Sequence, residues 1–223
     1  MKQTFKRLLS LLLALCLVLG YVPVTGFAAE NDDHAHSDVE VVEEVDSEEP
    51  KVVNATNPTL TITTAAQLAD LAAKVNDGTY GVCNVTLAAD ISLSGYSDWT
   101  PIGTAENPFR GKFDGMGHTI SNLKINAKDL KYAGLFGNIS NGGVKDLTVT
   151  GSVTVTQTKA SEGGSSYVGM IAGHLEDGIL YNCNVAGAVN VTGYNGDTLG
   201  DANWPTVGTL AGTVNHGVVI NCG

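Results

Sequence analysis

Cysteine is scarce in this chain of 223 residues, which contains only 4. One of them, Cys16, lies in an apolar segment near the N-terminus, and Cys83, Cys183 and Cys222 remain. An odd number of cysteines does not form a closed set of disulfides, so a disulfide framework is excluded as the source of stability. The chain must instead bury an apolar core, for which the roughly 165 residues after the N-terminal segments suffice.

Basic residues are also few. The 12 Lys and Arg stand against 23 Asp and Glu, which gives a formal net charge of -11. Ten of the acidic residues lie between positions 30 and 50, where no Lys or Arg occurs. Such a segment repels itself and buries little, which predicts a disordered spacer over residues 29–57. The rest of the chain has no basic excess, and this argues against a nucleic-acid partner.

Long apolar runs are missing as well. The most apolar run, over residues 8–19, is shorter than the ~20 residues that a membrane helix needs. Lys2, Lys6 and Arg7 precede it and small residues follow it, a pattern typical of a cleaved signal peptide over residues 1–28. We expect a secreted or cell-surface protein with no stable membrane span after cleavage; an uncleaved anchor is the minor alternative.

Metal-binding motifs are absent or incomplete. No HExxH zinc-protease motif occurs, and Asp197 and Asp201 lack the alternating spacing of a calcium loop. His34 and His36 stand among carboxylates and have the chemistry to chelate a divalent ion, but their place in the acidic spacer favours solvated side chains. We expect no metal and no cofactor.

Asp114 and His118, in the segment FDGMGH, are the best pair for a glycan-cleaving site. Such a site needs a second carboxylate that converges on the same bond, and the segment offers none. The same residues fit a plain turn, in which Asp114 accepts hydrogen bonds from backbone amides. We favour the turn and expect no catalytic residue.

Large aromatic rings in the loops have two interpretations. Their faces can stack on sugars, but large rings are more often buried packing residues. We favour packing and keep carbohydrate contact as the alternative. The rings concerned are Tyr96, Trp99, Tyr194 and Trp204.

Glycine, in contrast, is abundant, with 27 residues, and it marks a repeat. Residues 132–153, 168–189 and 207–223 align without gaps, and residues 109–131 join the same register. One column of this alignment holds Leu123, Leu147, Cys183 and Cys222, at intervals of 24, 36 and 39 residues. Units of this length cannot bury their apolar side alone and must stack on their neighbours.

The units consist of short segments in which apolar residues alternate, such as VKDLTV and VVINC. This alternation changes phase at Asn122, Asp146, Asn182 and Asn221, residue types that tolerate a left-handed corner and can bond from one turn to the next. The pattern predicts an all-β fold, a coil of short parallel strands. The longer intervals predict loops over residues 156–166 and 192–205, which are rich in turn-forming residues.

Residues 64–77 are expected to form a helix that caps the first turn. Thr64 and Gln67 have the spacing of a capping box, and Gly78 can end the helix in a left-handed conformation. Its apolar stripe consists of Leu68, Leu71, Ala72 and Val75. No such cap follows residues 207–223, so we expect an incomplete last turn and a chain that is a fragment.

The chain resembles bacterial surface proteins with GLUG repeats. The resemblance rests on ITTAAQLADLAAKVNDGTY, LAADISL, WTPIG, FRGKFDGMGHTISNLKI and YAGLFGNI, in which GLFG (residues 134–137) matches the Gly-Leu-any-Gly element. It implies a right-handed parallel β-helix over residues 58–223, within a large exported protein. Some relatives of this kind are immunoglobulin-cleaving metallopeptidases with the repeats upstream of the catalytic domain. No residue role is carried over.

These patterns together predict an exported, non-enzymatic surface module that is structural or adhesive. Its expected partners are cell-wall or host glycans or proteins, and its oligomeric state is open. The alternatives are a glycan-active β-helix enzyme, or the non-catalytic leading segment of a larger secreted peptidase.

Overall fold

A computed structural model of the chain describes residues 56–157, 166–193 and 205–223. The expected signal peptide over residues 1–28 lies outside these ranges, as do His34, His36 and almost all of the acidic spacer. The centres of the two expected loops are outside them too, and with them Tyr194, Trp204, Asp197 and Asp201.

Short strands make up most of the described chain, together with the helix α2 (Ala65–Asn76). The strands are β1 (Thr59–Ile62), β2 (Val82–Leu87), β3 (Ile91–Ser92), β4 (Arg110–Asp114), β5 (Thr119–Lys128), β6 (Tyr132–Ala133), β7 (Phe136–Ser140), β8 (Gly143–Lys145), β9 (Thr148–Thr156), β10 (Tyr167–Val168), β11 (Ala172–Glu176), β12 (Ile179–Tyr181), β13 (Asn184–Thr192), β14 (Thr206–Val207), β15 (Ala211–Asn215) and β16 (Val218–Ile220).

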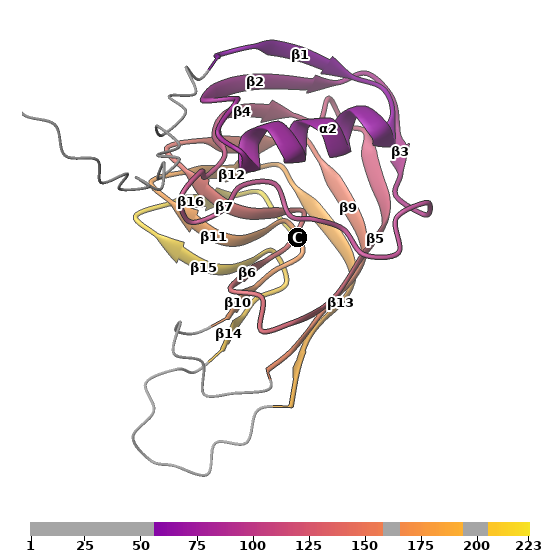
Figure 1. Cartoon of the computed structure of the whole chain (residues 1–223), viewed down its shortest axis with the longest axis vertical. Helices are drawn as coiled ribbons and strands as arrows, with labels where there is room; N and C mark the ends of the chain where they lie inside the picture. The colour runs from indigo at the N-terminus through magenta and orange to yellow at the C-terminus, as the bar shows by residue number, and fades with distance from the viewer. Residues whose placement is uncertain (1–55, 158–165, 194–204) are drawn as a thin grey trace, which may run out of the picture. The chain divides into compact units, whose positions relative to one another are not determined.

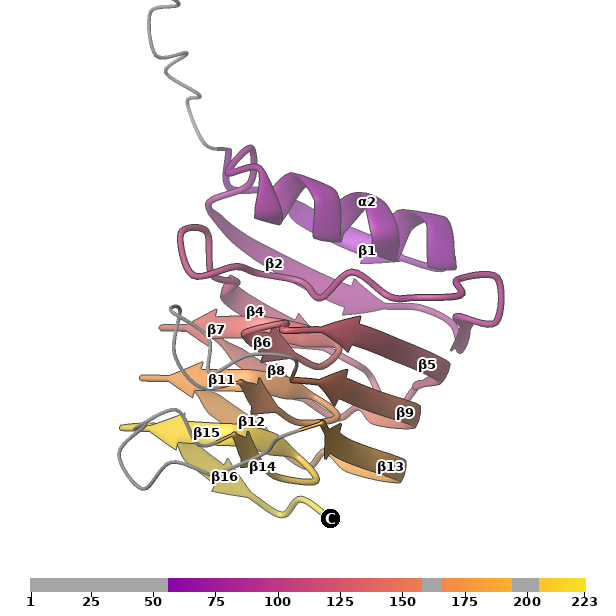
Figure 2. The same cartoon turned by 60° about the horizontal axis from the view of Figure 1, so that its bottom comes forward.

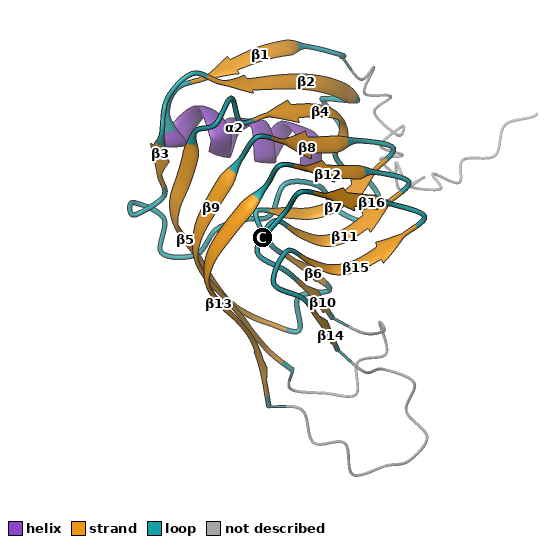
Figure 3. Ribbon diagram, turned by 180° about the vertical axis from the view of Figure 1, so that it is seen from behind, coloured by secondary structure: helices purple, strands orange, loops and turns teal. Residues whose placement is uncertain are grey.

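The strands form four sheets in which every ladder is parallel (Figure 1). The sheets are β1-β2-β4-β8-β12-β16, β3-β5-β9-β13, β6-β10-β14 and β7-β11-β15. From β4 onward the chain visits the four sheets in a fixed order, so each strand pairs with the one four places later, as Figure 3 shows from behind. The predicted parallel β-solenoid is confirmed.

The ladders confirm two of the three predicted intervals. Thr148 pairs with Asn184 and Ile179 with Val218, which are the expected 36 and 39 residues. The interval of 24 residues is wrong, because Leu123 pairs with Gly151 and not with Leu147. Leu123 still faces the core, at 1% exposure, but in a different column.

A bulge explains this error. The ladder between β5 and β9 shifts by one residue between Ile120 and Leu123, and Asn122 is the extra residue, with a φ of 58°. The corner that corresponds to Asp146 in the preceding turn is formed by Met116 and Gly117, whose φ values are 52° and 81°. The Gly117 amide donates a hydrogen bond to the Asp146 carbonyl.

The ungapped alignment of residues 132–153 with 168–189 is also wrong at its start. Tyr132 pairs with Tyr167, one residue before the expected Val168, whereas Phe136 pairs with Ala172 at the expected interval. The extra residue lies between Val168 and Ala172, within the looser glycine spacing of GMIAG. In this register Tyr132 and Tyr167 lie side by side on neighbouring strands.

The predicted corners of the later turns are confirmed. Asp146, Asn182 and Asn221 have φ values of 51°, 51° and 52°. The Asn182 side-chain amide donates to the Asp146 carboxylate at 2.6 Å, and the Asn221 amide donates to the Asn182 side-chain oxygen at 2.9 Å. These polar side chains therefore form a ladder of their own along the coil.

Helix α2 caps the first turn as predicted (Figure 2). Thr64 and Gln67 form the capping box, and Gly78 has a φ of 78°. The helix connects β1 to β2, which pair with each other in the same sheet. In this first turn the helix therefore stands where later turns have their strands of the other three sheets. Its buried residues are Leu68, Leu71, Ala72 and Val75, as expected.

The core is a column of apolar side chains inside the coil. Phe109, Phe113 and Phe136 form its aromatic centre, with ring centroids 5.0 Å apart for Phe109 and Phe136 and 5.3 Å for Phe113 and Phe136. All three side chains are fully buried. Because protein interiors are close-packed, these rings make the inside of the coil stiff.

Candidate functional site

The side chains of Asp114 and His118 do not converge on a common point. One Asp114 carboxylate oxygen accepts a hydrogen bond from the Met116 amide at 3.0 Å, and the other lies 2.6 Å from the Lys145 ammonium. His118 instead contacts Asp90, with 3.1 Å between Nδ1 and Oδ1. The turn interpretation is thus confirmed by the Asp114 hydrogen bond.

The cysteines also have structural surroundings. Cys83 and Cys183 are buried free thiols, and Cys222 is a free thiol that is half-buried. Cys222 is next to Cys183 as expected, since its sulfur accepts a hydrogen bond from the Cys183 amide at 3.3 Å. Burial raises the pKa of the Cys83 thiol to about 11 and that of Cys183 to about 12. A reactive cysteine needs a lowered pKa, so neither thiol is suited to nucleophilic chemistry.

Two of the four aromatic candidates can be placed. Trp99 is 3% exposed, and its indole nitrogen donates to the Leu135 carbonyl at 3.1 Å. Tyr96 packs edge-on against it, with centroids 5.7 Å apart. The packing interpretation of Trp99 is confirmed, and it offers no face for a sugar. Tyr194 and Trp204 lie outside the described residues.

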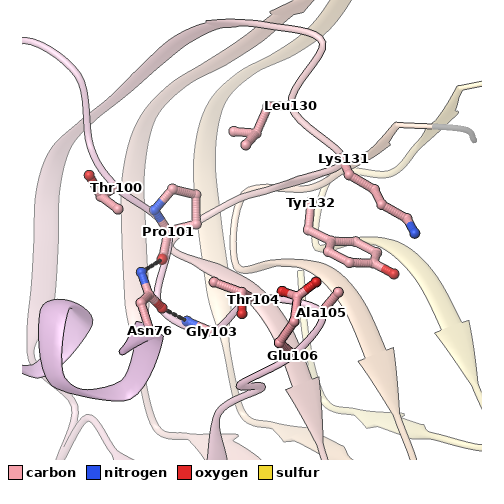
Figure 4. Close-up of a pocket in the computed structure, with 10 residues that line it drawn as sticks. All are labelled: Asn76, Thr100, Pro101, Gly103, Thr104, Ala105, Glu106, Leu130, Lys131 and Tyr132. Atoms are coloured by element: carbon pink, nitrogen blue, oxygen red, sulfur yellow. Dashed lines mark hydrogen bonds between the residues drawn. The ribbon is translucent and has the colours of Figure 1, made fainter. Parts of the chain in front are cut away.

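Figure 4 shows a groove that was not predicted from the sequence. Its volume is about 310 Å³, and we call it the Tyr132 groove. One wall is the connection between β3 and β4, and the other is the segment that leads into β6. The lining residues are Asn76, Thr100, Pro101, Gly103, Thr104, Ala105, Glu106, Leu130, Lys131 and Tyr132.

The last residue of α2 fixes the first wall. The Asn76 side chain donates to the Pro101 carbonyl at 3.0 Å and accepts from the Gly103 amide at 2.7 Å. The Asn107 side chain in turn donates to the Asn76 carbonyl at 3.0 Å. The helix that caps the coil therefore also holds the wall that carries Glu106.

Tyr132 is held in place by two other rings. Its ring stacks on Tyr167 with centroids 5.6 Å apart and planes 19° apart, and on His174 at 5.5 Å and 22°. Nδ1 of His174 lies 3.0 Å from the side-chain oxygen of Asn138. Burial lowers the pKa of His174, so at neutral pH it stacks as an uncharged ring.

Two side chains of the groove, Glu106 and Lys131, carry a charge. Within the described residues, neither Glu106 nor Lys131 forms an ion pair, although both are exposed. The Lys131 ammonium lies 5.3 Å from the centroid of the Tyr132 ring. The groove thus combines an aromatic ring, a carboxylate and an ammonium group on an apolar floor.

The parts of the chain that the structure describes contain no group of three or more His, Cys, Asp or Glu placed to hold a metal ion. Over the same residues, no helix has both the length and the apolar character that crossing a membrane requires.

Comparison with known proteins finds distant similarity. The chain is 37% identical over 136 residues to a putative Gly-rich membrane protein of Evansella cellulosilytica, a match that covers 58% of the chain and 14% of the relative. It is 37% identical over 139 residues to halomucin of Haloquadratum walsbyi, which covers 57% of the chain and 1% of the relative.

Both relatives are therefore much longer proteins, of which the chain spans a small part, and the name of one places it in a membrane. No family model matches the chain, so the resemblance to GLUG-repeat proteins stays a prediction. No solved structure matches it either.

Proposed function

We propose that the chain is an exported, surface-displayed β-solenoid with a structural and adhesive role and no enzymatic activity. The observation that carries this proposal is the continuous stacking of the turns. In all four sheets each turn is hydrogen-bonded along its strands to the next, which makes a stiff support for groups on its outside.

The chemistry of the described residues supports a binding role over a catalytic one. Asp114, the best candidate acid, is neutralised by Lys145 and bonded to the backbone of its own turn. A general acid or base must instead be free to reach the substrate. The Tyr132 groove, with a half-buried ring and two charged groups that form no ion pair among the described residues, offers contacts but no nucleophile with an adjacent base.

Surface display is supported by two independent features. The N-terminal residues fit a signal peptide, and one of the similar proteins is named as a membrane protein. An acidic spacer between the leader and the coil would hold the coil away from the cell envelope, because like charges extend a chain.

Labelling of intact cells tests this proposal. Cells that express the full chain are treated with a biotin ester that does not cross membranes, and the protein is then captured and quantified. We expect labelling of exposed lysines such as Lys112 and Lys124. The matched control is Leu13→Arg, which places a charge in the apolar run of the leader and should abolish labelling. Equal labelling of the two chains, or none of either, would refute surface display.

A further inference from the structure

We propose that the Tyr132 groove binds an uncharged carbohydrate, with one pyranose ring against Tyr132 and its hydroxyl groups bonded to Glu106 and Lys131. The inference rests on the proposed adhesive function and names the class of ligand that such a surface would hold. It uses a site that the sequence did not single out.

The aromatic ring supplies the apolar half of the recognition. The C–H groups on one side of a pyranose form a flat apolar face with a slight positive charge. The face of an aromatic ring is electron-rich, so the two attract each other and exclude water. Pro101 and Leu130 extend the apolar surface beside Tyr132, from opposite walls of the groove (Figure 4).

The groove is already organised for binding. Tyr132 is stacked on Tyr167 and His174, and the opposite wall is tied to Asn76 by two hydrogen bonds of 2.7 and 3.0 Å. A ligand therefore does not have to immobilise Tyr132 or the opposite wall when it binds, which removes part of the usual entropic cost.

The charges argue for a ligand without net charge. A carboxylate only accepts hydrogen bonds and an ammonium group only donates them, whereas a sugar hydroxyl does both. A hydroxylated ring can satisfy Glu106 and Lys131 together. An anionic ligand would be repelled by Glu106, and a cationic ligand by Lys131, over the few ångströms that the groove allows.

The size of the groove limits how much of a glycan it holds. Its volume of about 310 Å³ is at the lower end of the range of ~300–1,000 Å³ that is typical of ligand pockets. The groove therefore suits one or two sugar units of a longer chain. Several copies of a surface protein on one polysaccharide would then add up to firm adhesion.

A proline-rich peptide is the competing occupant, because such peptides also dock on aromatic grooves. The Glu106 carboxylate and the Lys131 ammonium favour the sugar, since a polyproline segment has carbonyl groups for the ammonium but no N–H or O–H group for the carboxylate. A decaproline peptide is therefore included in the test as a probe in its own right.

The test is a binding assay with the full chain. The uncharged probes are maltohexaose, cellohexaose and mannohexaose, the charged probes are hyaluronan and chitosan oligomers, and affinities are measured by calorimetry. We expect at least one uncharged probe to bind more tightly than both charged probes. Tyr132→Ala should weaken this binding about tenfold, and Glu106→Gln several-fold. Tyr132→Phe, which keeps the ring, should bind nearly as the parent does.

Tyr181→Ala is the matched control, because Tyr181 is a 46% exposed tyrosine on β12, outside the groove. Circular dichroism of each variant verifies that the coil is intact, and Glu106→Gln, on an exposed connection, tests the site without removing a packed ring. The proposal is overturned if no uncharged probe binds, if Tyr132→Ala and Tyr181→Ala bind alike, or if decaproline is the probe that depends on Tyr132.

These outcomes are separate from the test of surface display. A chain that is labelled on intact cells but binds none of the sugars keeps its proposed place and loses this ligand class. A chain that binds sugars but is not labelled keeps the groove assignment and loses the surface role.

Discussion

Replacing three glycines by alanine, one at a time, tests the close stacking of the turns. At Gly95 an added Cβ would meet nothing within 4 Å, and the backbone is ordinary. At Gly117 it would also meet nothing within 4 Å, but φ is 81°. At Gly151, φ is 153° and the Cβ would lie less than 3.0 Å from three backbone atoms of Leu123 in the neighbouring strand. The series therefore separates backbone strain from steric overlap.

The expected costs follow from these differences. Gly95→Ala should change stability little or raise it by about 0.4–1 kcal/mol, because alanine restricts the unfolded chain. Gly117→Ala should cost about 1–2 kcal/mol for a left-handed non-glycine residue. Gly151→Ala adds an overlap with backbone that cannot rotate away, because Leu123 and Gly151 are ladder partners. Its cost should be about 4 kcal/mol or more.

Thermal unfolding followed by circular dichroism measures the three variants. For a chain of this size about 4 kcal/mol corresponds to a fall in Tm of about 8–16 °C. If Gly151→Ala melts together with Gly117→Ala, the strands are not as close at this point as described, and the steric reasoning is refuted. If Gly95→Ala lowers the Tm as much as Gly151→Ala does, the loss of stability comes from replacing any glycine and not from the position of Gly151.

Three further outcomes are expected. Cys183 should resist a thiol reagent until the protein is denatured, whereas Cys222 should react in the native state. Mass spectrometry of labelled peptides measures both reactions, and labelling of Cys183 in the native state would contradict its burial and its pKa of about 12. Trp99→Phe should cost about 2 kcal/mol in urea unfolding, through a lost indole hydrogen bond and a small cavity, without changing sugar binding. Asn182→Ala should reduce the fall in Tm that acid causes, because the hydrogen bond from Asn182 lowers the pKa of Asp146 in the folded state. The stability that ionised Asp146 contributes is lost as the pH falls below about 4. An unchanged dependence of Tm on pH in this range would count against the ladder of corner side chains.

The sequence was sufficient to predict the coil wherever equivalent turns carry equivalent residues. Asp146, Asn182 and Asn221 share one corner, and the apolar residues after them repeat in register. The prediction from sequence failed at Asn122, which is an asparagine with a left-handed backbone, like Asn182, but lies in a bulge. The corner of that turn lies instead at Met116 and Gly117, inside the FDGMGH segment, which the sequence marks as a turn but not as the equivalent of Asp146.

The groove was beyond sequence reasoning for a related reason. It joins the end of α2 to residues 100–106 and 130–132, and their proximity depends on how far each irregular connection reaches across the coil. The stack of Tyr132 on Tyr167 was hidden by a shift of one residue in the repeat. In contrast, the capping helix was predictable, since its capping box and apolar stripe are local patterns.

The parallel ladders also determine how the protein would respond to tension. Each turn is fastened only to the turn before it and the turn after it, as Thr148 is to Thr119 and to Asn184. A force applied between distant points would therefore break the ladders one after another, and the protein would lengthen by one unfolded turn at a time. The stretch from Thr148 to Asn184 would add about 120 Å of extended chain when it comes free. We expect a protein built in this way to absorb mechanical work turn by turn when it is stretched.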